Sequence, residues 1–217
     1  MIWQNILLKG AEEIDLVVTP KQLQQFEVLL DELLKWNQKI NLTAITDFED
    51  IAVKHFIDSM TLFKVIDDEG TLLDVGSGAG FPAIPLKIMK PELQIVSVDA
   101  IGKKIMFQKH IARVLALKEF TPIHERVEKL YKNYTEHFNW IVSRAFASIE
   151  EFVELVDKLL AGNGKIIAMK GRDINSEIEN FRIKESANKF QIQEINFHLP
   201  VSDDERNFII FKQAVHV

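Results

Sequence analysis

The stretch LLDVGSGAGFP, residues 72–82, joins a run typical of a buried strand to a turn with glycine at every second position. Glycine has no Cβ and adopts positive φ readily, so alternating glycines let the backbone bend sharply and approach a ligand closely. The dinucleotide-binding fingerprint needs its third glycine one residue later, where this chain has Phe81. Gly76, Gly78 and Gly80 therefore favour a turn that binds a small polar ligand over a nicotinamide or flavin site, with an ordinary tight turn as the alternative.

The glycine spacing is similar to the first motif of S-adenosylmethionine-dependent methyltransferases, and the next strand extends this likeness. A strand expected at residues 94–98 ends at Asp99, nineteen residues after Gly80. An acid at about that distance, at the carboxyl end of a strand, is placed to accept hydrogen bonds from ribose hydroxyls. We interpret Asp99 as the ribose ligand. The alternative is a helix N-cap, because Asp is favoured before a helix and a helical pattern begins at Lys103.

Composition favours one compact domain with a small appendage, since the chain has 217 residues, 47% hydrophobic and 27% charged. The absence of cysteine excludes disulfides, thiolate metal sites and a cysteine nucleophile. No apolar run approaches the roughly 18 residues of a membrane span, and the first residues are acidic rather than a basic leader. We therefore expect a cytoplasmic protein. The six histidines lack paired ligand spacing, so we expect no metal.

The charge distribution qualifies the net charge of −6, which taken alone disfavours a nucleic-acid partner. Residues 1–70 hold thirteen acids against six Lys and Arg, whereas residues 103–118 hold five basic residues and no acid. A basic helix beside a cofactor site is suited to RNA phosphates, although a solvated helix face gives the same pattern. A further lysine ends the fifth expected strand and suits either an RNA phosphate or a helix cap. The candidate RNA contacts are Lys103, Lys104, Lys109, Arg113 and Lys170.

The pattern of hydrophobic residues changes at Gly70. Before it, apolar residues recur at helical spacing over residues 19–42, where Thr19 and Gln22 form a capping box, and again over residues 48–65. After it, strands and helices alternate, which predicts a mostly parallel sheet covered on both faces and closed by an antiparallel hairpin. The expected strands are residues 71–75, 94–98, 120–124, 139–143, 164–169, 190–197 and 207–212.

Ligands of such sheets bind outside the carboxyl ends of the strands, so the residues that follow each strand are candidates. After the third strand, residues 125–128 can bracket an adenine ring with backbone groups and an apolar wall, or form a solvated loop. The fourth strand ends at Ser143 and Arg144, where methyl-transferring folds hold their substrate. A structural ion pair is the alternative role for Arg144.

Seven short segments together carry a resemblance to a known family. They are WN at 36–37, NLT at 41–43, KHFIDS at 54–59, DVGSGAGFP at 74–82, IGKK at 101–104, SRA at 143–145 and MKG at 169–171. In this order and register they strongly resemble the ribosomal RNA small-subunit methyltransferase G family, also called glucose-inhibited division protein B. The resemblance spans nearly the whole chain. One departure is Ala83, which stands where the family usually carries another glycine.

The resemblance implies a class I S-adenosylmethionine-dependent methyltransferase fold, α/β and Rossmann-like, with a seven-stranded sheet. The methyltransferase domain is expected at residues 70–217, and a helical segment, residues 1–69, is expected to pack on it. The implied reaction transfers a methyl group from S-adenosyl-L-methionine to N7 of one guanosine in the 530 loop of 16S rRNA, in a bacterial cytoplasm. Another RNA, a protein or a small molecule is the alternative acceptor, and a monomer is expected. The implied cofactor contacts are Gly76, Phe81, Val127, Glu128 and Arg144.

The chemistry of the chain agrees with attack by guanine N7. Methylation of cytosine C5 needs a cysteine, and residues 143–146, SRAF, match neither the Asp/Asn-Pro-Pro motif of amine methylation nor the Asp used for ribose hydroxyls. N7 has a free lone pair and loses no proton, so the site must mainly position the base. Arg144 is suited to guanine O6 or to the cofactor carboxylate. Asn41, His55 and Asp58 are expected to line the same mouth, the last two on one helix face or simply as an internal pair.

Overall fold

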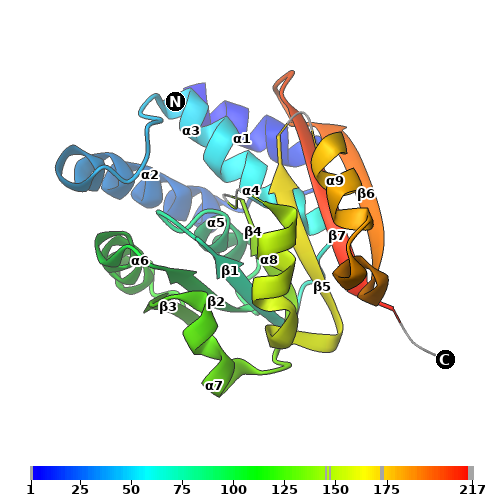
Figure 1. The fold of residues 1–217 in the computed structure, drawn as a ribbon. Coiled ribbons are helices and arrows are strands. Elements are labelled where there is room, and N and C mark those ends of the chain that lie inside the picture. Colours follow the sequence, from blue (N-terminus) through cyan, green and yellow to red (C-terminus); the bar gives the residue numbers. More distant parts are fainter. Residues whose placement is uncertain (1, 145, 147, 172–173, 215–217) are drawn as a thin grey trace.

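The computed structural model describes residues 2–144, 146, 148–171 and 174–214, which form a seven-stranded sheet between two layers of helices (Figure 1). The strand order is β3-β2-β1-β4-β5-β7-β6, in which the first five are parallel and β7 runs antiparallel to both β5 and β6. The predicted α/β class is confirmed. The strands are β1 Thr71–Val75, β2 Gln94–Asp99, β3 Phe120–His124, β4 Phe138–Ser143, β5 Leu160–Lys170, β6 Phe190–His198 and β7 Glu205–Gln213.

The strand predictions agree with the structure to within one residue at five strands. β7 begins at Glu205, two residues before its predicted start, and β5 begins at Leu160 rather than at residue 164. The extra residues come from an irregular register: Phe138 pairs with Leu160, whereas Trp140 pairs with Lys165. Such a bulge takes up additional residues in one strand without breaking the pairing of the next. The hydrophobic pattern alone does not reveal it, because the inserted segment is polar and rich in glycine.

The N-terminal part is helical, as expected, and contains one helix that the sequence pattern did not single out, α1, Ile2–Glu12. The predicted capping box is present: the side chain of Thr19 accepts from the Gln22 amide, and Gln22 reaches back to Thr19. The long helix that follows is α2, Pro20–Ile40. A bent helical run then consists of α3 Phe48–Ile51, the π-helical turn η1 Ala52–Ile57, α4 Asp58–Met60 and the 3₁₀ turn η2 Thr61–Lys64.

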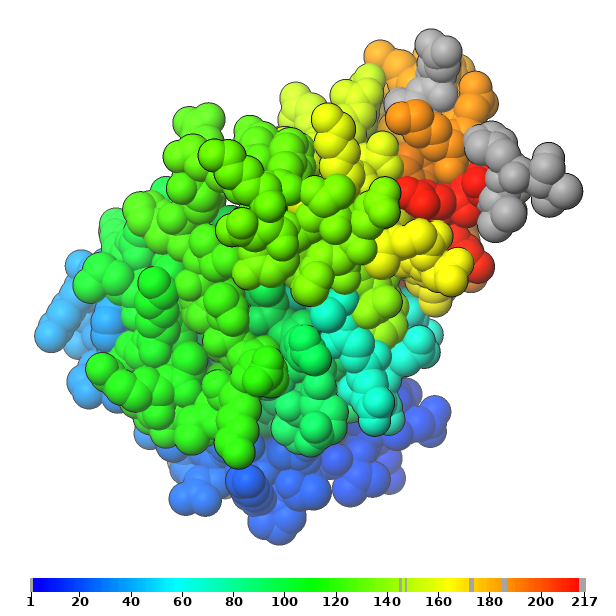
Figure 2. Space-filling view, turned by 90° about the horizontal axis from the view of Figure 1, so that it is seen from below, coloured from blue at the N-terminus to red at the C-terminus, as the bar shows by residue number. Residues whose placement is uncertain are grey.

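The remaining helices cover both faces of the sheet. They are α5 Ala83–Met89, α6 Gly102–Val114, η3 Val127–Leu130, α7 Tyr131–Tyr134, α8 Ile149–Val156, η4 Asp157–Leu159, α9 Asn175–Arg182 and η5 Glu185–Lys189. In Figure 1, α8 and α9 lie on the side of the sheet nearest the viewer, and the N-terminal helices lie along the top. Seen from below (Figure 2), the green middle of the chain forms most of the surface between the blue N-terminal helices and the orange C-terminal hairpin.

Two hydrophobic clusters hold these layers together. One joins α1, α2, α5 and α6 to one face of the sheet, where Phe26, Phe56 and Phe107 are fully buried. The other joins α8 and α9 to the opposite face. Because the N-terminal helices share a core with the sheet, they hold residues of the segment 41–58 against the carboxyl ends of the strands. The boundary between residues 69 and 70 stays a prediction.

Candidate active site

The glycine turn folds back on the end of β2. Gly76, Gly78 and Gly80 all have positive φ, at 69°, 57° and 90°, a region that residues with a Cβ rarely adopt. The amides of Gly76 and Ser77 both donate to the carbonyl of Val98, at 2.9 and 3.2 Å. A Cβ added to Gly76 would meet no other atom within 4 Å, so the backbone here faces open space that a ligand can enter.

A buried glutamine that the sequence pattern did not reveal fixes this turn from α6. The Gln108 side chain donates to the hydroxyl of Ser77 at 2.7 Å and to the carbonyl of Gly78 at 2.8 Å, and it accepts from Ser97 at 2.6 Å. Gln108 is fully buried. Its position among the apolar residues of α6 is the sequence feature that could have indicated a buried polar role. A Cβ added to Gly80 would clash with Ile84 and lie 3.3 Å from Cγ of Gln108, so Gly80 packs closely against both side chains.

Asp99 ties the glycine turn to the start of α6. One carboxylate oxygen accepts from the Gly78 amide and the other from the Ile101 amide, both at 2.8 Å. The N-cap residue of α6 is Ile101, so the alternative role of Asp99 as helix N-cap is wrong. Each oxygen keeps a second lone pair, and Asp99 lines the neighbouring cavity. The predicted ribose contact is therefore compatible with the geometry.

A cavity of about 380 Å³ lies beside Gly76 at the ends of β1, β2 and β3. Asp99 and Glu128 contribute carboxylates, while Val127 and Phe146 contribute apolar surface. This volume falls within the range of small-molecule sites, and the combination suits a nucleoside with hydroxyl and amino groups. The fully open backbone at Gly76 gives the close approach that such a ligand needs. These residues therefore fit S-adenosylmethionine.

Phe81, an expected cofactor contact, does not line this cavity. Its ring is buried and stacks on the His55 imidazole, with centroids 4.5 Å apart and planes 9° from parallel. The Arg144 guanidinium carbon lies 5.8 Å from the same ring. Phe81 therefore connects the glycine turn to the residues that the helical segment contributes.

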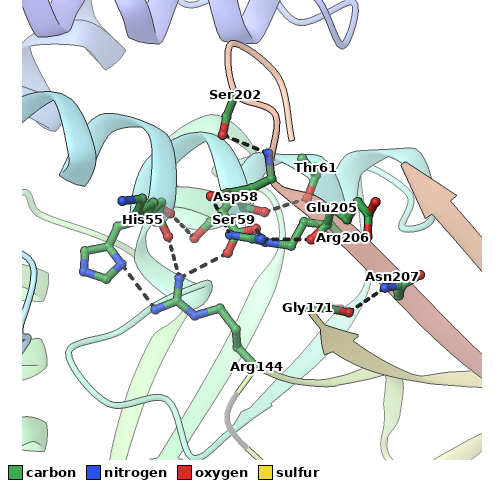
Figure 3. Close-up of polar contacts among 12 residues, drawn as sticks. His55, Asp58, Ser59, Thr61, Arg144, Gly171, Ser202, Glu205, Arg206 and Asn207 are labelled. Atoms are coloured by element: carbon green, nitrogen blue, oxygen red, sulfur yellow. Dashed lines mark hydrogen bonds and ion pairs between the residues drawn. The ribbon is translucent and has the colours of Figure 1, made fainter. Parts of the chain in front are cut away.

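Arg144 meets His55 and Asp58 at the end of β4 (Figure 3). Its Nη1 donates to the Lys54 carbonyl at 3.0 Å and lies 3.4 Å from Asp58 Oδ2, and its Nη2 lies 3.3 Å from His55 Nδ1. His55 and Asp58 come from the π-helical turn and the helix that follows it, a type of distortion that often marks functional sites. The predicted juxtaposition of these three residues is therefore present.

A second arginine that the sequence pattern did not identify completes this group. Arg206 donates from Nε to the other Asp58 oxygen at 2.8 Å. Because β7 runs antiparallel to β5, its first residues lie at the carboxyl ends of the parallel strands, and Lys170 pairs with Asn207. Arg144, His55, Asp58 and Arg206 are called the arginine cluster below. The predicted antiparallel hairpin could have identified Arg206, because its last strand must begin at the carboxyl edge of the parallel strands.

His55 is neutral in this arrangement. Burial and the nearby Arg144 guanidinium lower the pKa of His55 to about 3. Because Arg144 can only donate, Nδ1 accepts, and Nε2 then carries the proton that it shares with the Thr43 hydroxyl at 2.9 Å. Both ring nitrogens are therefore engaged in positioning contacts.

Asp74 lies in β1, two residues before Gly76, and is fully buried. Its Oδ2 accepts from the Ala83 amide at 3.2 Å, whereas Oδ1 has no partner among the described residues. Burial raises the pKa of Asp74 to about 7, although the Ala83 amide and the charge of Arg144 act in the opposite direction. Asp74 therefore keeps one buried carboxylate oxygen without a partner among the described residues.

Two other predicted site residues lie differently from expectation. Asn41 is the C-cap of α2, in the left-handed conformation, and its side chain is exposed. The structure does not bring it to the arginine cluster; Thr43 makes the contact with His55 instead. Lys170 donates to the Phe146 carbonyl at 2.9 Å and to Glu177 at 3.0 Å, so its charge is largely occupied within the fold.

A second cavity, of about 360 Å³, opens in front of the arginine cluster. Arg144 and Arg206 line it, with Asp58 as the one acid among the described lining residues. Lys54 and Lys170 also line it but are paired elsewhere. Two arginines against one carboxylate suit an electron-rich or anionic group. Ala145, part of the SRA segment, lies outside the described residues. Within the described part of the chain, no group of three or more potential metal ligands occurs, and no helix has the length and apolarity to cross a membrane.

Comparisons with known proteins agree with this geometry. The chain resembles the "Ribosomal RNA small subunit methyltransferase G" of Geotalea uraniireducens (strain Rf4), with 46% identity over 97% of both chains. A S-adenosylmethionine-dependent methyltransferase from Aquifex aeolicus shares the fold, with a TM-score of 0.59, 13% identity and coverage of 82% of this chain and 98% of that one. TYW2 of M. jannaschii, solved in complex with AdoMet, gives a TM-score of 0.58 at 11% identity, covering 72% and 75%.

The family model described as rRNA small subunit methyltransferase G matches residues 22–208, which include the glycine turn and all four residues of the arginine cluster. This match covers most of the chain and confirms the resemblance inferred from the seven segments. The chain therefore belongs to the rRNA small subunit methyltransferase G family.

Proposed function

We propose that this protein transfers a methyl group from S-adenosylmethionine to N7 of a guanosine in the 530 loop of 16S rRNA. The observation that carries the proposal is the contact between the glycine turn and the arginine cluster, in which Phe81 stacks on His55 and faces Arg144. This contact links the turn beside the donor cavity to His55 and Arg144, which line the acceptor cavity. The family supports RNA of the small ribosomal subunit as the acceptor.

The cavity beside Gly76 holds the donor. Asp99 and Glu128 offer acceptors for hydroxyl and amino groups, Val127 offers an apolar wall, and Gly76 permits contact with the backbone. When bound, S-adenosylmethionine supplies a methyl group on a positively charged sulfur, which is open to attack by a nucleophile with a free lone pair.

The arginine cluster suits an acceptor that needs no general base. Guanine N7 carries no proton, so methylation needs no base, and the residues around it need only orient the guanine at near-attack distance. His55 is neutral with both nitrogens engaged, and Asp58 is paired with two arginines, so neither is poised to remove a proton. The N–H groups of Arg144 are suited to guanine O6, which lies beside N7.

The base must leave its stack to enter the acceptor cavity, at a cost of a few kcal/mol that is smallest for loops that are already irregular. We place the reaction on a ribosomal particle or assembly intermediate in the cytoplasm, with the enzyme as a monomer. Contacts with RNA shape then supplement charge, which fits a chain with a net charge of −6.

The test is to incubate the protein with labelled S-adenosylmethionine and, separately, with naked 16S rRNA and with small ribosomal subunits from cells lacking this gene. We expect one guanosine of the 530 loop to gain a methyl group at N7, located by primer extension and mass spectrometry. Label in a protein, in a small molecule or in another RNA would instead support the alternative acceptor.

Arg144→Ala separates the acceptor role from the donor role. We expect methyl transfer to be lost while calorimetry shows donor affinity within about threefold of wild type, since Arg144 does not line the donor cavity. Arg182→Ala is the matched control. Arg182 is an exposed arginine at the end of α9, and it pairs with Glu194 of β6. Unchanged methylation by the Arg144 variant would remove this residue from the site.

A further inference from the structure

We propose that the outer faces of α2 and α6 form a second RNA contact, which binds rRNA phosphates at a distance from the methylated base. We call it the two-helix basic surface, and it consists of Lys35, Lys39, Lys103, Lys109 and Arg113. The inference rests on the proposed function and deepens it, because it assigns the docking of the same substrate to a defined surface outside both cavities.

The two helices are fixed side by side by a seam of ring and polar contacts. The Trp36 ring of α2 lies 5.7 Å from the Phe107 ring and 5.0 Å from the His110 ring of α6, measured between centroids. Glu32 contacts His110 across the same seam, with 2.5 Å between Oε2 and Nε2. Side chains one helical turn along from this seam therefore stand next to each other on one surface.

The charge of this surface is largely uncompensated. Lys39, Lys103 and Lys109 are exposed, and no carboxylate among the described residues forms an ion pair with them. Arg113 is exposed and contacts His110 rather than an acid. Glu32 pairs with Lys35 and with His110, so this acid is already satisfied.

Several lysines elsewhere in the chain are paired with acids instead. Lys54 pairs with Asp50, Lys129 with Glu125, and Lys184 with Glu150. These ion pairs reduce the attraction of those regions for a polyanion. Phosphate neutralisation by free Lys and Arg supplies most of the sequence-independent affinity for nucleic acids, so a surface on which four of the five cations have no acidic partner in the described part of the chain is a stronger candidate than those three pairs.

The surface leads away from the catalytic edge of the sheet. Its first helix ends at Ile40, three residues before Thr43, which contacts His55. Its second helix begins at Gly102, and the Lys104 ammonium lies 4.0 Å from the position of a Cβ on Gly78. From Lys103 to Arg113 the helical rise covers roughly 15 Å, which is long enough for more than one phosphate contact.

The experiment compares two double variants of matched charge. Lys39→Ala with Lys103→Ala removes two cations from the two-helix basic surface. Lys132→Ala with Lys212→Ala is the control, because both lysines are exposed and lie on α7 and near the end of β7, away from the carboxyl ends of the parallel strands. For each protein, binding of naked 16S rRNA and of small subunits is measured at several salt concentrations, together with kcat, KM and donor affinity.

We expect the first double variant to raise KM on the order of tenfold and to lower the slope of log affinity against log salt by about 1 for each lost phosphate contact. Its kcat and donor affinity stay within twofold of wild type, which a general folding defect would not leave intact. An equal effect of the control pair, or an unchanged salt slope, overturns the proposal. Weaker binding to subunits alone, with binding to naked rRNA unaffected, also overturns it and assigns the surface to a ribosomal protein.

If wild-type protein methylates the expected guanosine while both double variants behave like wild type, the proposed function stands and only this surface assignment fails. If wild-type protein methylates no rRNA, the proposed function fails first. The two failures are therefore distinguishable.

Discussion

The donor cavity and the arginine cluster occupy the same edge of the sheet but are built in opposite ways. The donor cavity is shaped by backbone, by the glycine turn and by residues directly after three consecutive strands. The arginine cluster is made by side chains from residues 55 to 206, which meet only because α4, β4 and β7 converge. A site built from backbone is encoded locally, whereas one built from distant side chains depends on the whole topology.

Removing the shared carboxylate is expected to break the arginine cluster with the largest effect. Asp58→Ala leaves Arg144 and Arg206 without their common partner, and loss of one member of a buried ionic group costs about 3 kcal/mol of unfolding free energy. Methyl transfer should disappear as well. Chemical denaturation and an activity assay measure both, while calorimetry should show that the donor still binds.

Asp50→Ala is the control for that variant, because Asp50 pairs with Lys54 at a largely exposed position. Such exposed pairs contribute little to stability, because water and salt screen them. Equal destabilisation by both variants would mean that Asp58 is not a hub of the fold, and loss of donor affinity in Asp58→Ala would mean that the two regions are not separable.

The reverse test alters the glycine turn. Gly76→Ala places a methyl group in the open space of the donor cavity at a φ of 69°, which costs about 1–2 kcal/mol of backbone strain. We expect donor affinity to fall at least tenfold, measured by calorimetry, with the arginine cluster intact. Gly162→Ala is the control, since a Cβ there meets no other atom within 4 Å and the residue lies far along β5 from the cavity. Donor affinity that survives in Gly76→Ala would contradict the placement of the ligand.

A pH series sharpens the comparison through Asp74, which lies between the two regions. Its pKa is raised to about 7 from an ordinary value of 3.8, so the folded state binds this proton more tightly than the unfolded state. The stabilisation is fully present below pH 3.8 and is lost as the pH rises towards 7. Asp74→Asn should therefore flatten the fall in unfolding free energy between pH 5 and pH 7 by on the order of 1 kcal/mol. Parallel curves for the two proteins would show that the carboxyl group is already charged at pH 5.

His55 gives the smallest expected effect. Its pKa is lowered to about 3, so the folded state disfavours its protonation, and its contribution to stability is complete above pH 6.5 and falls as the pH drops below that value. Between pH 6 and pH 9 its charge does not change. We expect His55→Gln to reduce kcat by the same factor at pH 6, 7.5 and 9, in assays with small ribosomal subunits. A factor that grows with pH would indicate that His55 acts as a base.

Much of the fold could be predicted because most strands and helices are specified by residues that are close together in the sequence. Alternating apolar runs and the glycine turn marked five of the seven strands to within one residue, and the capping box marked the start of α2. The bulge at the start of β5 could not be predicted in this way, because it depends on the register between β4 and β5.

The site residues show the same difference between local and long-range determinants. Asp99 and Val127 followed from their positions after strands, and the cavity that they line is present. Arg206 and Gln108 escaped prediction because their roles depend on contacts with residues far away in the sequence. Asn41, a residue inside a family segment, is the C-cap of α2 and has a left-handed backbone; its expected role at the mouth stays a prediction.

The late position of Arg206 has a consequence for translation. All residues that line the donor cavity are synthesised before β6 and β7, whereas Asp58 acquires its second arginine only when the last strand of the sheet is made. A nascent chain therefore carries its complete donor-binding sequence while the mouth for RNA still lacks one wall. The order of synthesis therefore makes the arginine cluster one of the last parts of the fold that can be completed.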